Sequence, residues 1–144
     1  MIPTRIAAIA ALTTTFVLNG LAPALADDTG HIALELNALD GENQTCRLTF
    51  LVTNQHTTPI DKLVYETVVF TKDGRVDRLT LFDFGALPVS RPRVRQFELS
   101  DLGCADLGQV LINGAHACTG DALPNGACVN DLRLSSRTDA GLTG

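Results

Sequence analysis

The chain has 144 residues, a formal net charge of -5 at pH 7, 45% hydrophobic residues and four cysteines. This length fits one small domain and excludes a multidomain enzyme or a large cofactor-binding fold. The acidic balance argues against general nucleic-acid binding, which requires an excess of Lys and Arg to neutralise phosphates.

The first 26 residues have the composition of a secretory signal peptide. Arg5 is their only charged side chain, and they end in Ala24-Leu25-Ala26, an A-x-A cleavage pattern. An uncleaved transmembrane anchor is the alternative, although polar residues and Pro23 dilute the apolar stretch. We therefore expect residues 1–26 to be removed, leaving no membrane span. Residues 27–144 are then a single domain in the periplasm or outside the cell.

The expected mature chain has 118 residues and, because Arg5 is lost, 10 basic against 16 acidic side chains, a net charge of -6. All four cysteines lie in this part, at Cys46, Cys104, Cys118 and Cys128. An even number of cysteines in a small exported domain predicts two disulfides. No C-x-x-C spacing supports a structural zinc site, so we expect neither metal nor cofactor.

Three disulfide pairings are possible. Cys46–Cys104 with Cys118–Cys128 is favoured, because the second pair closes a short loop rich in Gly, Pro and Asn and the first joins an early strand to a late one. Cys46–Cys128 with Cys104–Cys118 stays an alternative, because Cys104 and Cys118 flank one predicted strand.

Apolar residues alternate along the mature chain with period 2, which predicts strands. In chain order the predicted strands are residues 32–38, 46–53, 63–71, 76–84, 94–99, 110–112 and 128–134. Residues 138–144 are expected to form a weakly ordered tail or a last edge strand. Residues 63–71 are apolar on both faces, which is typical of a central strand. Asp73-Gly74 predicts a hairpin turn after it.

The predicted strand 76–84 changes parity, because its leucines are odd-numbered and its phenylalanines even-numbered. This predicts a bulge or a twisted edge. Consecutive apolar residues at such a point leave one aromatic ring exposed, and Phe82 is the candidate for a binding surface.

About seven strands with no helical period predict an all-β, disulfide-bonded domain. Their number and spacing fit a β-sandwich of the immunoglobulin or fibronectin type. A small β-barrel is the alternative.

The one concentration of charge is Arg91, Arg93 and Arg95, which alternate with Pro92 and Val94. In an extended segment this spacing puts the three guanidinium groups on one side, where they could bind carboxylates, phosphates or an acidic partner strand. The alternative is that a charged, proline-bearing edge prevents strand addition.

Much of the mature chain resembles uncharacterised exported proteins of alphaproteobacteria. The segments that carry this resemblance are residues 79–84, 87–88, 93–97, 104 and 110–113. The resemblance implies a periplasmic location and no particular activity.

Neither a nucleophile elbow nor a phosphate-binding glycine motif is present in the sequence. We therefore expect a non-enzymatic binding or structural module that contacts an envelope protein or acidic ligand, and no nucleic acid. A small-ligand or carbohydrate-binding module is the alternative and predicts a concave polar pocket. A small hydrolase is a third hypothesis and would depend on His56 or His116.

Overall fold

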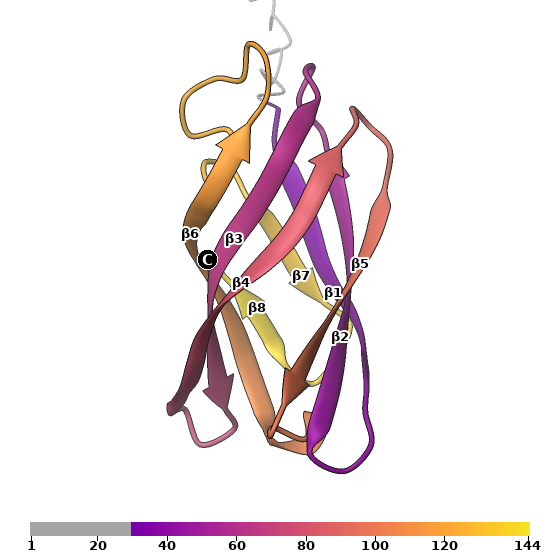
Figure 1. Ribbon diagram of the computed structural model, residues 1–144, viewed down its shortest axis with the longest axis vertical. Helices are drawn as coiled ribbons and strands as arrows, with labels where there is room; N and C mark the ends of the chain where they lie inside the picture. Colours follow the sequence, from indigo (N-terminus) through magenta and orange to yellow (C-terminus); the bar gives the residue numbers. More distant parts are fainter. Residues whose placement is uncertain (1–29) are drawn as a thin grey trace, which may run out of the picture.

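The computed structural model describes residues 30–144, so the predicted signal peptide lies outside the described residues. Within them, eight strands form two four-stranded sheets that pack face to face (Figure 1). The predicted β-sandwich is confirmed, and the sheets do not close into a barrel.

The first sheet has the strand order β5-β2-β1-β7 and the second has the order β4-β3-β6-β8. The strands of the first sheet are β5 (Arg93–Ser100), β2 (Thr45–Asn54), β1 (Ile32–Asp40) and β7 (Arg133–Ser136). The strands of the second are β4 (Val76–Leu87), β3 (Ile60–Thr71), β6 (Leu107–Thr119) and β8 (Gly141–Thr143).

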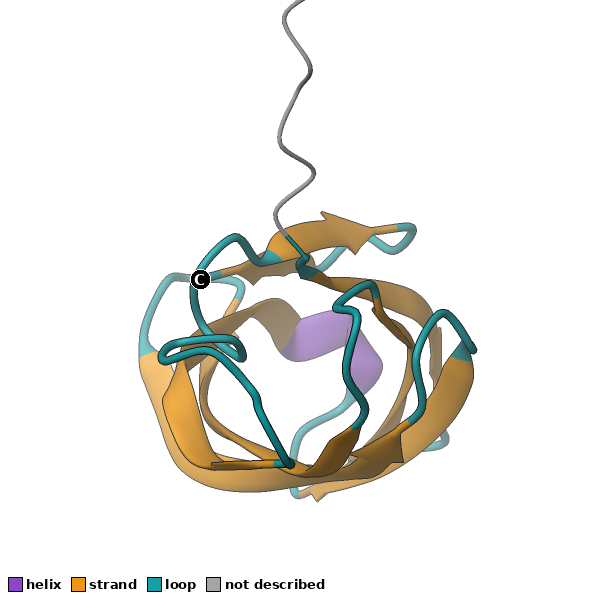
Figure 2. Ribbon diagram, turned by 90° about the horizontal axis from the view of Figure 1, so that it is seen from above, coloured by secondary structure: helices purple, strands orange, loops and turns teal. Residues whose placement is uncertain are grey.

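Alternating apolar residues of both sheets make the core. In β2, Cys46, Leu48, Phe50 and Val52 are all completely buried, while the residues between them are partly or fully exposed. Such a strand can bury its apolar face only against a second sheet, so the period-2 pattern leads directly to two layers. Viewed from above, the strands surround this core, with the short 3-10 helix η1 (Cys104–Asp106) at the far end (Figure 2).

The predicted central strand is confirmed, because β3 lies between β4 and β6. The predicted hairpin is also present: the N–H of Gly74 donates to the carbonyl of Thr71 at 2.9 Å. Gly74 has φ +82°, a left-handed conformation that glycine adopts without steric cost.

The favoured disulfide pairing is confirmed. Cys46–Cys104 joins β2 to η1 with a Cα–Cα distance of 4.8 Å, and Cys118–Cys128 joins the end of β6 to the following loop with 6.1 Å. The two bonds lie at opposite ends of the sandwich (Figure 1). Each therefore ties an end where the backbone pairing of the sheets stops.

The loop after β6 is held by more than its disulfide. The buried Tyr65 hydroxyl donates to the carbonyl of Cys128 at 2.7 Å, and Nε2 of His56 lies 2.8 Å from the carbonyl of Ala127. Burial raises the pKa of the Tyr65 phenol, which keeps it protonated as a donor.

The sequence-based prediction of strand ends was less accurate after residue 100. The short strand expected at residues 110–112 extends over 13 residues as β6, with irregular register against β3. The strand expected at 128–134 begins only at Arg133. The last edge strand, one of the two expectations for residues 138–144, is confirmed as β8. The polar residues of β6 and β7 and the glycines of β6 made the bounds of these two strands hard to predict. Their backbone pairing does not depend on an alternation of apolar residues.

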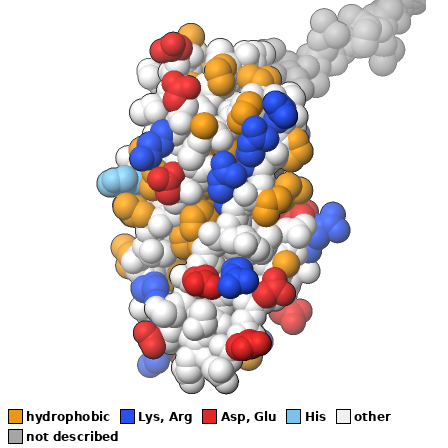
Figure 3. Space-filling model, turned by 45° about the vertical axis from the view of Figure 1, so that its right-hand side comes forward, with side chains coloured by type: hydrophobic (Ala, Val, Ile, Leu, Met, Phe, Trp, Pro, Cys, Tyr) orange, Lys and Arg blue, Asp and Glu red, His pale blue; other side chains and the backbone are white. Residues whose placement is uncertain are grey.

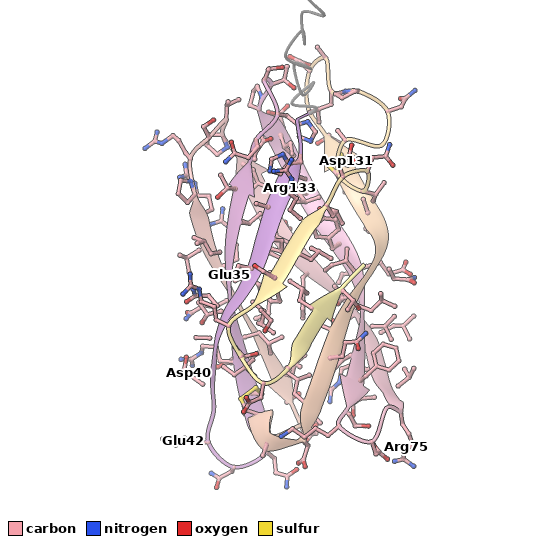
Figure 4. All side chains as sticks on the ribbon, turned by 180° about the vertical axis from the view of Figure 1, so that it is seen from behind. Glu35, Asp40, Glu42, Arg75, Asp131 and Arg133 are labelled. Carbon is pink, nitrogen blue, oxygen red and sulfur yellow. A yellow bond between two sulfur atoms is a disulfide. The ribbon has the colours of Figure 1, made fainter. Side chains whose placement is uncertain are left out.

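The two lateral sides of the sandwich differ. On one side, β7 pairs in parallel with β1 and β8 pairs in parallel with β6, so the last residues of the chain pass from one sheet to the other. Figure 4 shows this side from behind, with Glu35 on β1 beside β7. On the other side, β4 and β5 are the end strands of the two sheets, and each pairs with a single neighbour.

Candidate binding site at the open edge

The arginine segment lies at the side bounded by β4 and β5, which we call the open edge. In the register of β5 with β2, Arg95 is opposite Phe50 and Arg93 is opposite Val52. Directly opposed residues of antiparallel strands share one face of a sheet. Because Phe50 and Val52 face the core, Arg93 and Arg95 also point toward the second sheet rather than away from the sandwich.

Arg95 connects the two edge strands. Its Nε donates to the carbonyl of Phe84 on β4 at 2.7 Å, and its Nη1 donates to the carbonyl of Val94 at 3.0 Å. Phe84 is the unpaired residue at a register shift between β3 and β4, so its carbonyl would otherwise lack a strand partner. The guanidinium of Arg95 therefore lies at the free backbone edge of β4.

The other two arginines of the segment are less engaged. Arg93 donates through Nη1 to the carbonyl of Pro92 at 3.1 Å, and Arg91 is exposed in the loop before β5. Figure 3 shows a diagonal row of Lys and Arg side chains on this face, bordered by hydrophobic side chains.

These three arginines differ from Arg47 and Arg137 in their acidic partners. Arg47 pairs with Glu98 at 2.8 Å, which raises the pKa of the guanidinium, and Arg137 pairs with Glu35 at 2.9 Å. Within residues 30–144, no ion pair joins Arg91, Arg93 or Arg95 to a carboxylate. Among residues 30–144, three neighbouring cations are thus without a carboxylate partner.

The expectation that Phe82 is exposed was wrong. Only 3% of Phe82 is accessible, and its ring stacks on Phe97 of β5 with centroids 4.3 Å apart and an interplanar angle of 8°. The register from Val68–Leu79 to Tyr65–Phe82 has no shift, so the parity change is not a bulge. Even-numbered residues here face the core and odd-numbered ones face solvent. The register shifts of β4 lie near its two ends instead.

Two exposed leucines of β4 were missed by the sequence-based reasoning. Leu79 is 63% exposed and Leu81 is 48% exposed, both on the outer face of the second sheet. Beside them on β3, Val64 and Val68 also face outward but are nearly covered. The signal was present in the sequence: apolar residues of both parities had already indicated two covered faces in residues 63–71.

Surface hollows occur elsewhere and are open. One of about 630 Å³ lies at the turn between β1 and β2, where Arg47 and Glu98 already bind each other. Another of about 510 Å³ lies beside the Cys118–Cys128 loop.

The two histidines considered for a hydrolase have different surroundings. His56 is buried and its Nε2 is engaged with the loop carbonyl of Ala127, whereas His116 is exposed on β6. In the described part of the chain, no cluster of three His, Cys, Asp or Glu side chains is arranged to hold a metal ion.

Comparison with known proteins identifies no relative of this chain: no family model matches, and neither a curated protein nor a solved structure gives a significant match. The resemblance to exported alphaproteobacterial proteins stays a prediction. None of the helices formed by residues 30–144 is long and apolar enough to cross a membrane.

Proposed function

We propose that this protein is an exported binding module that recognises an acidic segment of a partner protein in the cell envelope. The observation that carries the proposal is the group of three arginines at the open edge that have no carboxylate partner among residues 30–144. Arg is suited to this role, because its planar fork of donors matches a carboxylate in geometry and charge.

The alternative role of the arginines, edge protection, is compatible with this proposal. Arg95 covers the carbonyl of Phe84, and inward-pointing charges discourage strand addition to β5. Within residues 30–144, the guanidinium groups of Arg91 and Arg93 donate to no group on another strand, so their charge is available to a partner. Local positive charge on an acidic molecule also favours the correct orientation of an acidic partner during encounter.

An extracytoplasmic location is supported by two features. The chain has two disulfides and no free cysteine within residues 30–144, and such bonds persist mainly in oxidising compartments. The predicted signal peptide is the second feature and leads to the same location.

The experiment measures binding of fluorescent oligoglutamate to the mature protein by anisotropy at low and high salt. We expect binding that weakens with salt and falls at least about tenfold in the double variant Arg91→Glu/Arg93→Glu, because exposed charge pairs are screened and here reversed. Arg95 is left intact because it bonds β4.

The matched control is Arg75→Glu combined with Lys72→Glu, which makes the same charge change at the β3–β4 hairpin. Equal losses in both double variants would show that only net charge matters and would contradict the proposal. So would a wild-type protein that does not bind the peptide.

A further inference from the structure

The free edge of β4 differs from that of β5 in how well it is protected. Pro92 directly precedes β5, and the core-facing side of β5 carries Arg93 and Arg95. By contrast, residues 79–82 of β4 read Leu-Thr-Leu-Phe, with neither a charge nor a proline. Natural proteins protect edge strands with charges and prolines, so this part of β4 is the section open to another strand.

The two faces next to that section have different chemistry. On the outer face, the exposed Leu79 and Leu81 side chains lie on β4 itself. On the inner side, the guanidinium of Arg95 reaches the Phe84 carbonyl, and Arg93 shares its face of β5. A strand placed along β4 would therefore have leucines beside one of its faces and arginines near the other.

A strand added to a sheet lies about 4.8 Å from its neighbour and points successive side chains to opposite faces. One set of its side chains would extend the apolar outer face past Leu79 and Leu81. The other set would point into the open edge, where Arg95 binds the Phe84 carbonyl just beyond this section. Successive side chains of the added strand would therefore meet the apolar face and the arginine face in turn. A segment that fits both faces must alternate apolar and acidic residues.

We infer that the partner contributes an extended segment of alternating acidic and apolar residues, which pairs through its backbone with β4 along residues 79–82. This inference rests on the proposed function and adds the binding mode and the sequence pattern of the partner. Backbone hydrogen bonds along the edge would supply sequence-independent affinity, and the two faces would supply specificity.

The first test compares two synthetic peptides of equal composition and blocked ends. One alternates Glu and Val, and the other has a Glu block followed by a Val block. We expect the alternating peptide to bind the mature protein at least about tenfold more tightly, because only it places carboxylates and apolar side chains on opposite faces. Anisotropy titrations give both dissociation constants.

A second test examines the backbone directly. In an added strand, only every other N–H points toward the neighbouring strand. Methylating the backbone nitrogens of one set, Glu or Val, should weaken binding at least about tenfold, while methylating the other set should change it less than about threefold. Amide hydrogen exchange should then show new protection in β4 and none in β5.

A third test uses variants of exposed residues, so that folding is preserved. Leu79→Ser/Leu81→Ser should reduce binding of the alternating peptide to the level of the block peptide. Val94→Ser is the matched control, because Val94 is 58% exposed on the outer face of β5 and should not affect binding.

The outcomes separate this inference from the proposed function. If the two peptides bind equally and binding is still lost in Arg91→Glu/Arg93→Glu, strand addition is wrong and the acidic-partner function stands. If methylation of both sets is tolerated, or if both sets weaken binding equally, strand addition is also wrong. If no acidic peptide binds, both proposals are wrong.

Discussion

The two lateral sides of the sandwich are closed by different kinds of interaction. On the C-terminal side, β7 and β8 extend the two sheets with backbone hydrogen bonds and bury Ala140 and Leu142. On the open edge, the stacked rings of Phe82 and Phe97 and the side chain of Arg95 bridge β5 and β4. β7 and β8 are end strands as well, but with 4 and 3 residues they leave only a short backbone edge, whereas β4 leaves an edge of 12 residues. The side with the longer free edge is the one at which we propose that a partner binds.

The largest effect should come from the C-terminal side. Deleting residues 138–144 removes β8 and the buried side chains of Ala140 and Leu142. We expect the free energy of unfolding to fall by about 4 kcal/mol, since the deletion leaves the space of a buried leucine unfilled. Urea denaturation of the mature protein measures this loss. A change below about 1 kcal/mol would show that backbone closure contributes little to stability, against the comparison.

A somewhat smaller effect is expected from the aromatic contact of the open edge. Phe97 stacks on Phe82 and packs edge-on against Phe50 and Phe84. Phe97→Ala should cost about 3 kcal/mol, because it leaves a cavity between the sheets. Phe97→Leu is the control and should cost less than about 1.5 kcal/mol. If both cost the same, the ring geometry does not hold this side together.

Arg95 and Arg93 should contribute differently to the free energy of unfolding. Arg95→Met removes the bond to the Phe84 carbonyl and should cost about 1 kcal/mol, the usual net value of a partly exposed hydrogen bond. Arg93→Met should change stability by less than about 0.5 kcal/mol, because among residues 30–144 its guanidinium bonds only to the carbonyl of its own neighbour Pro92. Equal effects in urea denaturation would contradict the different roles assigned to the two residues.

The smallest effect concerns pH on the C-terminal side. Glu35 of β1 accepts hydrogen bonds from Asn37 at 2.7 Å and from Arg137 at 2.9 Å, and these bonds lower its carboxyl pKa. A folded-state pKa below the unfolded one stabilises the protein at neutral pH, and that contribution is lost as the pH falls through the folded pKa.

Glu35→Gln should therefore be slightly less stable than the wild type at pH 7. The difference should disappear once the pH is well below about 4, the ordinary range of a glutamate. Urea midpoints of both proteins across this range test the sign. A difference that grows in acid would show that Glu35 is not held in its charged form.

Much of the fold could be predicted from local features of the sequence. Period-2 alternation located β1, β2 and β3, because each must bury one or both faces. Asp73-Gly74 located the hairpin, and the turn-rich segment between Cys118 and Cys128 indicated their disulfide.

The errors arose where side-chain pattern and backbone pairing are independent. The strand β7 pairs in parallel with the distant β1, and nothing near it in the sequence requires this pairing. We expected Phe82 to be exposed because the apolar residues of this strand have both parities. A regular strand with apolar side chains on both faces gives the same sequence pattern as a strand whose single apolar face is shifted by a bulge.

By itself, the sequence determined an all-β sandwich, its disulfide count and a row of alternating arginines. These follow from short-range periodicity and composition, which act within one strand. Only the tertiary structure decided that Arg93 and Arg95 point inward and that Leu79 and Leu81 point outward. It also decided that β4 and β5 share one open side. These facts depend on the register and order of strands far apart in the chain, which are set by how the two sheets bury their common core.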